Sequence, residues 1–148
     1  MIIIGTQEGD RVEIERISKI YIPDPCGHPY LDGGSYRNYF QARAHVSSGG
    51  FSGSITLYLE LICFLDFLEE LEVLHEKLTG TAEFNDGVGK LYIKVSGDGK
   101  GHIKIKGRVS RESTGGTELQ FEIKTDQTNS PKTIKSVKDL LNDAKNDN

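Results

Sequence analysis

The sequence has no tryptophan, and methionine, cysteine and proline are scarce, with one Met, two Cys and four Pro among 148 residues. Cys26 lies in a Pro/Gly-rich segment and Cys63 in an apolar one. Two cysteines in such different settings do not form a disulfide framework, so they favour a reducing compartment. A chain of this length buries roughly 70% of its unfolded surface without covalent staples. We expect one domain over 1–148, with an N-terminal part (1–38), a core (39–141) and a frayed tail (142–148).

Long apolar runs and a strong charge are also missing. No run approaches the ~20 apolar residues of a membrane span. The first ten residues, MIIIGTQEGD, lack the basic region of a signal peptide. The formal net charge of −4 is mild and argues against a general nucleic-acid binder, which is usually basic. We therefore expect a cytoplasmic protein with no membrane association.

The longest segment with helical periodicity runs from Leu57 to Leu78 and contains neither Gly nor Pro. Its apolar residues recur every three or four positions, which predicts an amphipathic helix with a broad buried face. They are Leu57, Leu61, Phe64, Leu68, Leu71 and Leu78, widened by Leu65, Phe67 and Leu74. His75 falls within this arc and is expected to be a hydrogen-bonded core residue. Gly80 is expected to cap the helix in a left-handed conformation.

Segments with alternating apolar and polar residues flank this helix on both sides, and alternation predicts strands with one buried face. They lie at 12–22, 39–46, 51–57, 81–84, 91–95, 103–109 and 119–123, with a further short strand or frayed arm at 1–5. Ser130 and Pro131 are expected to begin a short C-terminal helix. The order of elements predicts an α+β fold: one curved antiparallel sheet of about six to eight strands, ending in a meander, packed on one long helix.

Candidate sites for chemistry are few. Cys26-Gly27-His28 is the best pair of metal ligands, but zinc needs three or four ligands and the other Cys and His residues are scattered. The SGDGKG segment at 96–101 lies between two strands and is expected to be a hairpin turn. We expect no catalysis, no metal and no cofactor. An enzyme that uses the Cys26–His28 loop is one alternative, although spatial triads cannot be seen in a sequence.

The outer face of the predicted meander is rich in basic residues. The residues that alternate with the apolar ones are Lys90, Tyr92, Lys94, His102, Lys104, Lys106, Arg108, Glu118, Gln120, Glu122 and Lys124. One hypothesis is a small nucleic-acid- or phosphate-binding module that uses this face, but sheet faces that stack bases carry several aromatic side chains and only Tyr92 qualifies here. The favoured interpretation is a solvated face whose lysines pair with Glu118 and Glu122.

Short segments between 40 and 141 resemble the WapI-like immunity proteins of bacterial polymorphic toxin systems. They are Phe51-Ser52-Gly53, Glu60-Leu61, Gly80-Thr81-Ala82, Leu91-Tyr92-Ile93, Gly101-His102-Ile103, Gly107 and Leu119-Gln120-Phe121-Glu122-Ile123, followed by Asp126-Gln127-Thr128. Residues 1–38 match no part of this pattern. The resemblance implies a cytoplasmic, non-enzymatic protein that binds and neutralises a cognate toxin domain. Such toxins are often nucleases.

A partner surface is predicted on the main helix. At about 100° per residue, one stripe away from the apolar face holds Ile62, Asp66, Glu69, Val73 and Glu76, named here the α1 ridge. Carboxylates would compete with phosphate for the basic cleft of a nuclease, and the aliphatic residues would supply dry contact. The alternative is an ordinary solvated face with Ile62 and Val73 packed on the N-terminal strands. Secondary candidates are Asp126, Gln127 and Thr128, whose alternative role is a structural turn.

Overall fold

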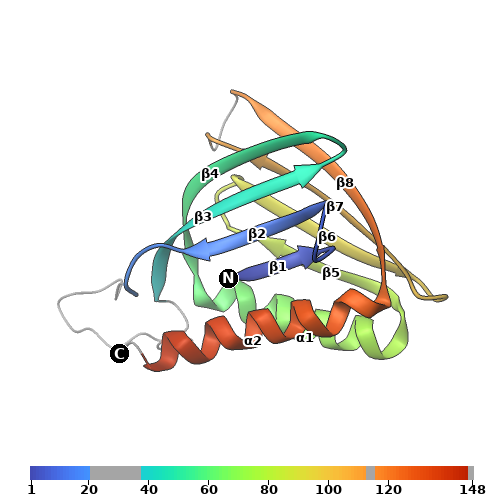
Figure 1. The fold of residues 1–148 in the computed structure, drawn as a ribbon. Helices are drawn as coiled ribbons and strands as arrows, with labels where there is room; N and C mark the ends of the chain where they lie inside the picture. The colour runs from blue at the N-terminus through green and yellow to red at the C-terminus, as the bar shows by residue number, and fades with distance from the viewer. Residues whose placement is uncertain (21–37, 113–115, 147–148) are drawn as a thin grey trace.

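The computed structural model describes residues 1–20, 38–112 and 116–146. Two antiparallel sheets of four strands face each other, and two helices run along one end of the pair (Figure 1). The first sheet has the order β1-β2-β3-β4, with β1 at Ile2–Gly5, β2 at Arg11–Arg16, β3 at Tyr39–Ser48 and β4 at Phe51–Glu60. The second has the order β5-β6-β7-β8, with β5 at Thr79–Asn85, β6 at Leu91–Asp98, β7 at His102–Ser110 and β8 at Glu118–Asp126.

The α+β class is confirmed, but the expectation of one curved sheet is wrong. α1 (Leu61–Lys77) separates the two sheets in the chain, and each sheet pairs only consecutive strands. Alternation within a strand shows which residues turn inward, but it does not show whether strands before and after a helix share a ladder. The C-terminal meander is confirmed as the whole of the second sheet.

The core lies between the sheets and is closed at one end by α1. Phe64 of α1 stacks on Phe40 of β3, with ring centroids 6.0 Å apart. On the other side, Phe84 of β5 lies 4.8 Å from Phe64 and 5.8 Å from Phe67. These four aromatic side chains are fully buried, so α1 joins the inner faces of both sheets. The prediction that the main helix organises the packing is confirmed in this sense.

The first four residues assigned to the main helix belong to a strand instead. β4 continues to Glu60, with Leu57 paired to Ala42 and Leu59 paired to Phe40. Leu57 and Leu59 are buried and Tyr58 is exposed, so strand alternation replaces helical spacing here. At the other end of β4, alternation with Gly53, Ile55 and Leu57 predicts an inward Phe51, but Phe51 is 72% exposed and this prediction is wrong.

The end of α1 also differs from the prediction. Leu78, not Gly80, caps the helix in the left-handed conformation, with φ of 62°, although Gly80 also has a positive φ of 110°. Its N–H donates to the carbonyl of Leu74 at 2.7 Å, and its carbonyl accepts from the N–H of Gly99 at 2.8 Å. This carbonyl would lie 2.4 Å from a Cβ on Gly97, so only glycine allows the β6–β7 turn to approach the helix end. His75 is exposed, contrary to its predicted core position.

The two ends of the chain meet at β1. A 3₁₀ turn at Gln127–Asn129 leads into α2, which spans Ser130–Asn146 and is therefore longer than the short helix expected. The buried Ala144 lies inside the segment predicted to fray. The first strand is confirmed by β1, whereas β2 ends at Arg16, so residues 17–20 of the predicted 12–22 strand are not part of it, and 21–22 lie outside the described residues. The hydroxyl of Thr133 donates to the carbonyl of Ile3 at 2.8 Å.

Candidate functional site

The α1 ridge occupies the face of α1 opposite its buried stripe. Leu61, Phe64, Phe67, Leu71 and Leu74 are the buried residues of the helix. At 3.6 residues per turn, the ridge residues project from the other side of the axis. Asp66, Glu69 and Glu76 are exposed, Val73 is 46% exposed and Ile62 is half-buried. The ridge is therefore a continuous surface that mixes carboxylates with an exposed valine.

Neighbouring elements touch α1 on both flanks of the ridge. On one flank, a carboxylate oxygen of Glu70 accepts from the backbone N–H of Glu83 in β5 at 3.4 Å. On the other flank, Glu72 forms an ion pair with Lys138 of α2, with 3.2 Å between Oε1 and Nζ. These contacts engage the flanking carboxylates and fix the orientation of the helix. The carboxylates of Asp66, Glu69 and Glu76 form no ion pair with any other described residue and are thus available to a partner.

A groove of about 330 Å³ opens at the C-terminal half of the ridge, between α1 and the start of β5. Its lining residues are Glu69, Glu70, Val73, Leu74, Thr79, Gly80 and Thr81. Two of them, Glu69 and Val73, also belong to the α1 ridge. None of the lining residues is basic, so the groove carries a negative charge.

The Asp126-Gln127-Thr128 segment has a clear structural role. Asp126 caps the 3₁₀ turn, because its Oδ1 accepts from the N–H of Thr128 at 2.9 Å and from the Thr128 hydroxyl. The Thr128 hydroxyl is the main cause that lowers the pKa of Asp126. The N–H of Gln127 donates to the carbonyl of Gly101 at 2.9 Å, which docks the turn on the β6–β7 hairpin. The three residues thus join β8 to α2, and their part in partner binding stays a prediction.

The outer face of the second sheet is basic but partly neutralised. The predicted pairing of lysines with glutamates is seen for Lys104 and Glu122, whose Nζ and Oε1 are 3.5 Å apart. The guanidinium of Arg108 lies over the ring of Tyr92, 5.4 Å from its centroid. Burial, the charge of Glu83 and a hydrogen bond to Glu83 raise the pKa of Tyr92. An open depression lies at this point, lined by Tyr92, Lys106, Gly107, Arg108, Gln120, Phe121 and Glu122.

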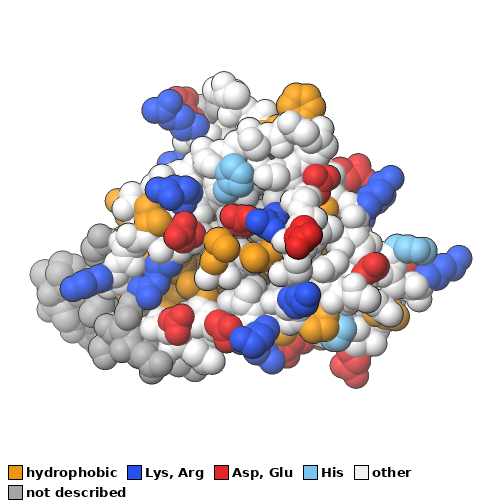
Figure 2. Space-filling view, viewed as in Figure 1, with side chains coloured by type: hydrophobic (Ala, Val, Ile, Leu, Met, Phe, Trp, Pro, Cys, Tyr) orange, Lys and Arg blue, Asp and Glu red, His pale blue; other side chains and the backbone are white. Residues whose placement is uncertain are grey.

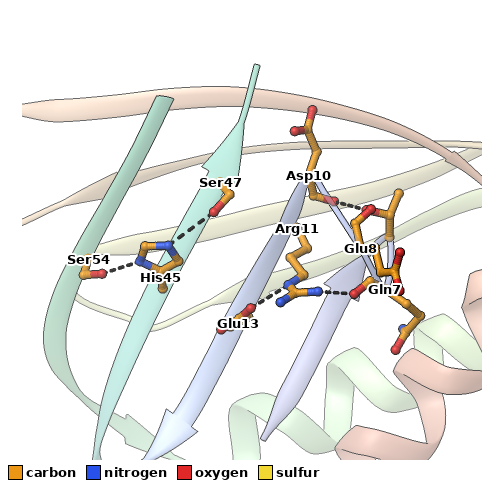
Figure 3. Close-up of polar contacts among 9 residues, drawn as sticks. Gln7, Glu8, Asp10, Arg11, Glu13, His45, Ser47 and Ser54 are labelled. Carbon is orange, nitrogen blue, oxygen red and sulfur yellow. Dashed lines mark hydrogen bonds and ion pairs between the residues drawn. The ribbon is translucent and has the colours of Figure 1, made fainter. Parts of the chain in front are cut away.

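A histidine with two serine neighbours, on the outer face of the first sheet, was missed by the sequence reasoning. His45 Nδ1 is 2.5 Å from the Ser54 hydroxyl and Nε2 is 3.2 Å from the Ser47 hydroxyl (Figure 3). His45 and Ser54 are paired across the β3–β4 hairpin, so equal spacing from the turn at Gly49–Gly50 could have placed them together. Glu13, which pairs with His45 on the other side, is bound by Arg11 Nε at 2.5 Å. That contact leaves the histidine without the orienting carboxylate of a nucleophilic triad.

The remaining candidates give no further site. Cys26 and His28 lie outside the described residues. Cys63 is half-buried, and burial raises the pKa of its thiol, which fits the small apolar residue expected there. In the described ranges, no cluster of three or more His, Cys, Asp or Glu side chains could hold a metal ion. Within the same ranges, no helix is long and apolar enough to cross a membrane. Acidic and basic side chains are interspersed over the face formed by β1–β4 and α2 (Figure 2).

An exposed helix face that mixes carboxylates with aliphatic side chains, beside an acidic groove, is complementary in charge to a basic protein surface. The model of the Immunity protein WapI-like family matches residues 2–144. The chain therefore belongs to this family, which implies that it neutralises a toxin. The match includes residues 2–38, so it extends beyond the 40–141 part whose segments carried the resemblance. No curated protein matches the chain. Immunity proteins are typically non-enzymatic.

Proposed function

We propose that this protein neutralises a cognate toxin domain by binding it through the α1 ridge, in the cytoplasm and without catalysing a reaction. Family membership supports toxin neutralisation. The exposure of the ridge supports its role, because the opposite face of α1 is committed to the core and both flanks contact neighbouring elements. The single observation that carries the choice of surface is the half-exposed Val73 between the acidic residues Glu69 and Glu76.

The toxin that best fits this surface is a nuclease. A nuclease cleft must be basic enough to hold phosphates. Asp66, Glu69 and Glu76 would occupy the positions of phosphate charges in such a cleft and speed the encounter. Ile62 and Val73 would supply the water-excluding contact that an interface centre needs. Binding in this way would block the cleft and so inactivate the toxin.

The test begins by sequencing the genes adjacent to this one, and its probe is the toxin domain that they are expected to encode. Wild-type protein is expected to bind this domain and to rescue cells that express it. The double charge reversal Asp66→Lys with Glu69→Lys is expected to weaken binding at least tenfold and to reduce its dependence on salt, because carboxylate contacts are lost. Titration calorimetry at two salt concentrations measures both effects.

The matched control reverses two exposed acids elsewhere, Glu8→Lys with Glu118→Lys, and produces the same net charge. It should bind almost as the wild type does. Equal weakening by both pairs would mean that net charge, not the ridge, drives association. Unchanged affinity and salt dependence in a folded Asp66/Glu69 variant would remove the ridge from the interface. The Asp126–Thr128 turn is then the next surface to test.

A second candidate function is phosphate or nucleic-acid binding on the outer face of the second sheet. The depression beside Lys106 and Arg108, with Tyr92 at its wall, favours it. The Lys104–Glu122 ion pair and the Glu83–Tyr92 contact weigh against it, since they place carboxylates on the same face. A fluorescent single-stranded oligonucleotide is the probe. Binding that is lost in the double variant Lys106→Glu with Arg108→Glu would support this function.

A further inference from the structure

One edge of the second sheet keeps unpaired backbone groups beside the acidic groove. β5 is the first strand of its sheet and pairs only with β6. The N–H of Glu83 points away from β6, because it donates to Glu70 of α1. Backbone groups alternate in direction along an antiparallel strand. The N–H and C=O of Thr79 and Thr81 therefore point to the same free edge.

The opposite edge of the sheet confirms this alternation. The carbonyl of Glu122 in β8 accepts from the hydroxyl of Ser48, so it points away from β7. Glu122 pairs with Lys106, Lys106 with Lys94, and Lys94 with Glu83. Hydrogen-bonded and non-hydrogen-bonded pairs alternate along this row of partners. Because the backbone groups of Glu122 point away from β7, those of Glu83 point away from β6, in agreement with the contact between Glu83 and Glu70.

The groove has a closed end and a bridged end. The left-handed turn at Leu78 closes one end, where α1 passes into β5, and the Glu70–Glu83 hydrogen bond crosses the other. The span from Thr79 to Glu83 along β5 is about 13 Å, because a strand rises about 3.3 Å per residue. The space thus fits an extended segment of roughly four residues.

At other positions of the edge strands β1 and β5, side chains are hydrogen-bonded to the outward backbone groups. In β1, the N–H of Ile3 donates to the hydroxyl oxygen of Ser136 at 3.4 Å, and the carbonyl of Ile3 accepts from the Thr133 hydroxyl at 2.8 Å. In β5, Glu70 covers Glu83. Among the described residues, none is bonded to the outward groups of Thr81, which is exposed. An uncovered edge is a template for pairing with another chain.

Building on the proposed function, we propose that this groove takes a short, extended, basic segment of the toxin domain as an added strand beside β5. The backbone of that segment pairs with Thr81, which is the general mode of strand addition at a sheet edge. Its alternate side chains face Val73 and Leu74 on one side. Its cations lie against Glu69 and Glu70, the only charged residues of the lining, and this charge complementarity selects a basic segment.

The backbone contact is tested with Thr81→Pro, which removes the outward N–H while the β5–β6 ladder keeps its bonds. We expect at least a tenfold loss of affinity for the toxin domain used in the test of the proposed function. The matched control is Gln120→Pro, since the N–H of Gln120 points away from β7 on the opposite edge. It should bind as the wild type does. Equal binding by both folded variants would overturn the inference.

The charge of the occupant is tested at Val73, where Lys and Glu are compared. Both substitutions remove the same apolar contact, so only the sign of the added charge differs. Val73→Lys is expected to bind at least tenfold more weakly than Val73→Glu. The reverse order would overturn a basic occupant.

A measurement on the unaltered chain does not depend on any variant being folded. In the wild-type complex, the amide of Thr81 is expected to gain at least tenfold protection from hydrogen exchange. If the wild type binds the toxin domain but Thr81 gains no protection, strand addition is wrong and the proposed function stands. If the wild type does not bind it at all, the proposed function and this inference both fail.

Discussion

At the scale of single residues, Gly107 shows how closely the second sheet is packed. A Cβ at this position would lie 2.3 Å from the carbonyl oxygen of Tyr92 and 2.6 Å from Cζ of Phe121. The Phe121 ring occupies the space that a side chain would need. We expect Gly107→Ala to lower the free energy of unfolding by about 1–3 kcal/mol, the usual cost of overpacking. Chemical denaturation measures this difference.

Gly53 of β4 is the matched control for Gly107. A Cβ there would make an ordinary 3.5 Å contact with Leu119. Gly53→Ala should change stability by no more than about 0.5 kcal/mol, or increase it through the less flexible unfolded chain. A Gly107→Ala variant as stable as Gly53→Ala would show that β7 can shift away from Phe121.

A second residue-scale prediction concerns Asp98 in the β6–β7 turn. A hydrogen bond from the His102 side chain is the main cause that lowers the pKa of Asp98 to about 2. The carboxylate is favoured in the folded state, so its stabilising effect is complete above the ordinary value of 3.8 and is lost as pH falls through about 2. Asp98→Asn should remove this loss of folding stability at acidic pH. An NMR titration of the Asp98 carboxyl with a midpoint near 4 would contradict the prediction.

The sequence predicted burial well where one strand face is apolar throughout. Alternation over 39–46 predicts that Phe40, Ala42, Ala44 and Val46 share one face of β3, and all four are fully buried. The contact between His45 and Ser54 was missed, although the equal spacing of the two residues from the Gly49–Gly50 turn indicates it. The sequence could not predict Leu78 in a left-handed conformation, because a hydrogen bond from Gly99, 21 positions further along the chain, stabilises that turn.

At the scale of elements, the leucine side chains of α1 differ more in burial than their spacing in the sequence suggests. Leu71 is 5% exposed, whereas Leu68, expected in the core, is only partly buried. We expect Leu71→Ala to cost about 2–5 kcal/mol of unfolding free energy, as core leucines do. Leu68→Ala should cost roughly 1 kcal/mol. Urea denaturation of both variants checks the order, and equal costs would show that both sites are equally packed.

The start of α1 illustrates why element boundaries escape sequence reasoning. Leu57 and Leu61 are four apart, as in a helix, but Leu57 and Leu59 also alternate, as in a strand. Leu57 and Leu59 both pair with residues of β3, and this pairing makes the segment a strand. The ridge residues lie after this boundary, so their placement on one face of the helix did not depend on where the helix begins.

At the scale of the whole molecule, the topology was the part that sequence could not provide. The spacing of apolar residues predicts which side chains of a strand face the core. It does not predict which strands are hydrogen-bonded neighbours, and this pairing is what defines a sheet. α2 then connects the end of the chain to its beginning: Ile134, Val137, Leu140, Leu141 and Ala144 are buried, and its first turns reach β1. The β1 edge of the first sheet is thus covered by residues more than 120 positions away in the sequence.

This cover predicts that Thr133 protects the edge of β1. Thr133→Val keeps the shape of the side chain but leaves the carbonyl of Ile3 without its donor, since Thr133 is 5% exposed and donates to it at 2.8 Å. An unsatisfied buried acceptor costs about 1–3 kcal/mol. We expect that loss of unfolding free energy, together with faster hydrogen exchange in β1. Thr56→Val, at an exposed position of β4, is the control and should leave both unchanged. If Thr133→Val behaves like Thr56→Val, the apolar face of α2 alone secures the edge, and the hydroxyl contributes nothing.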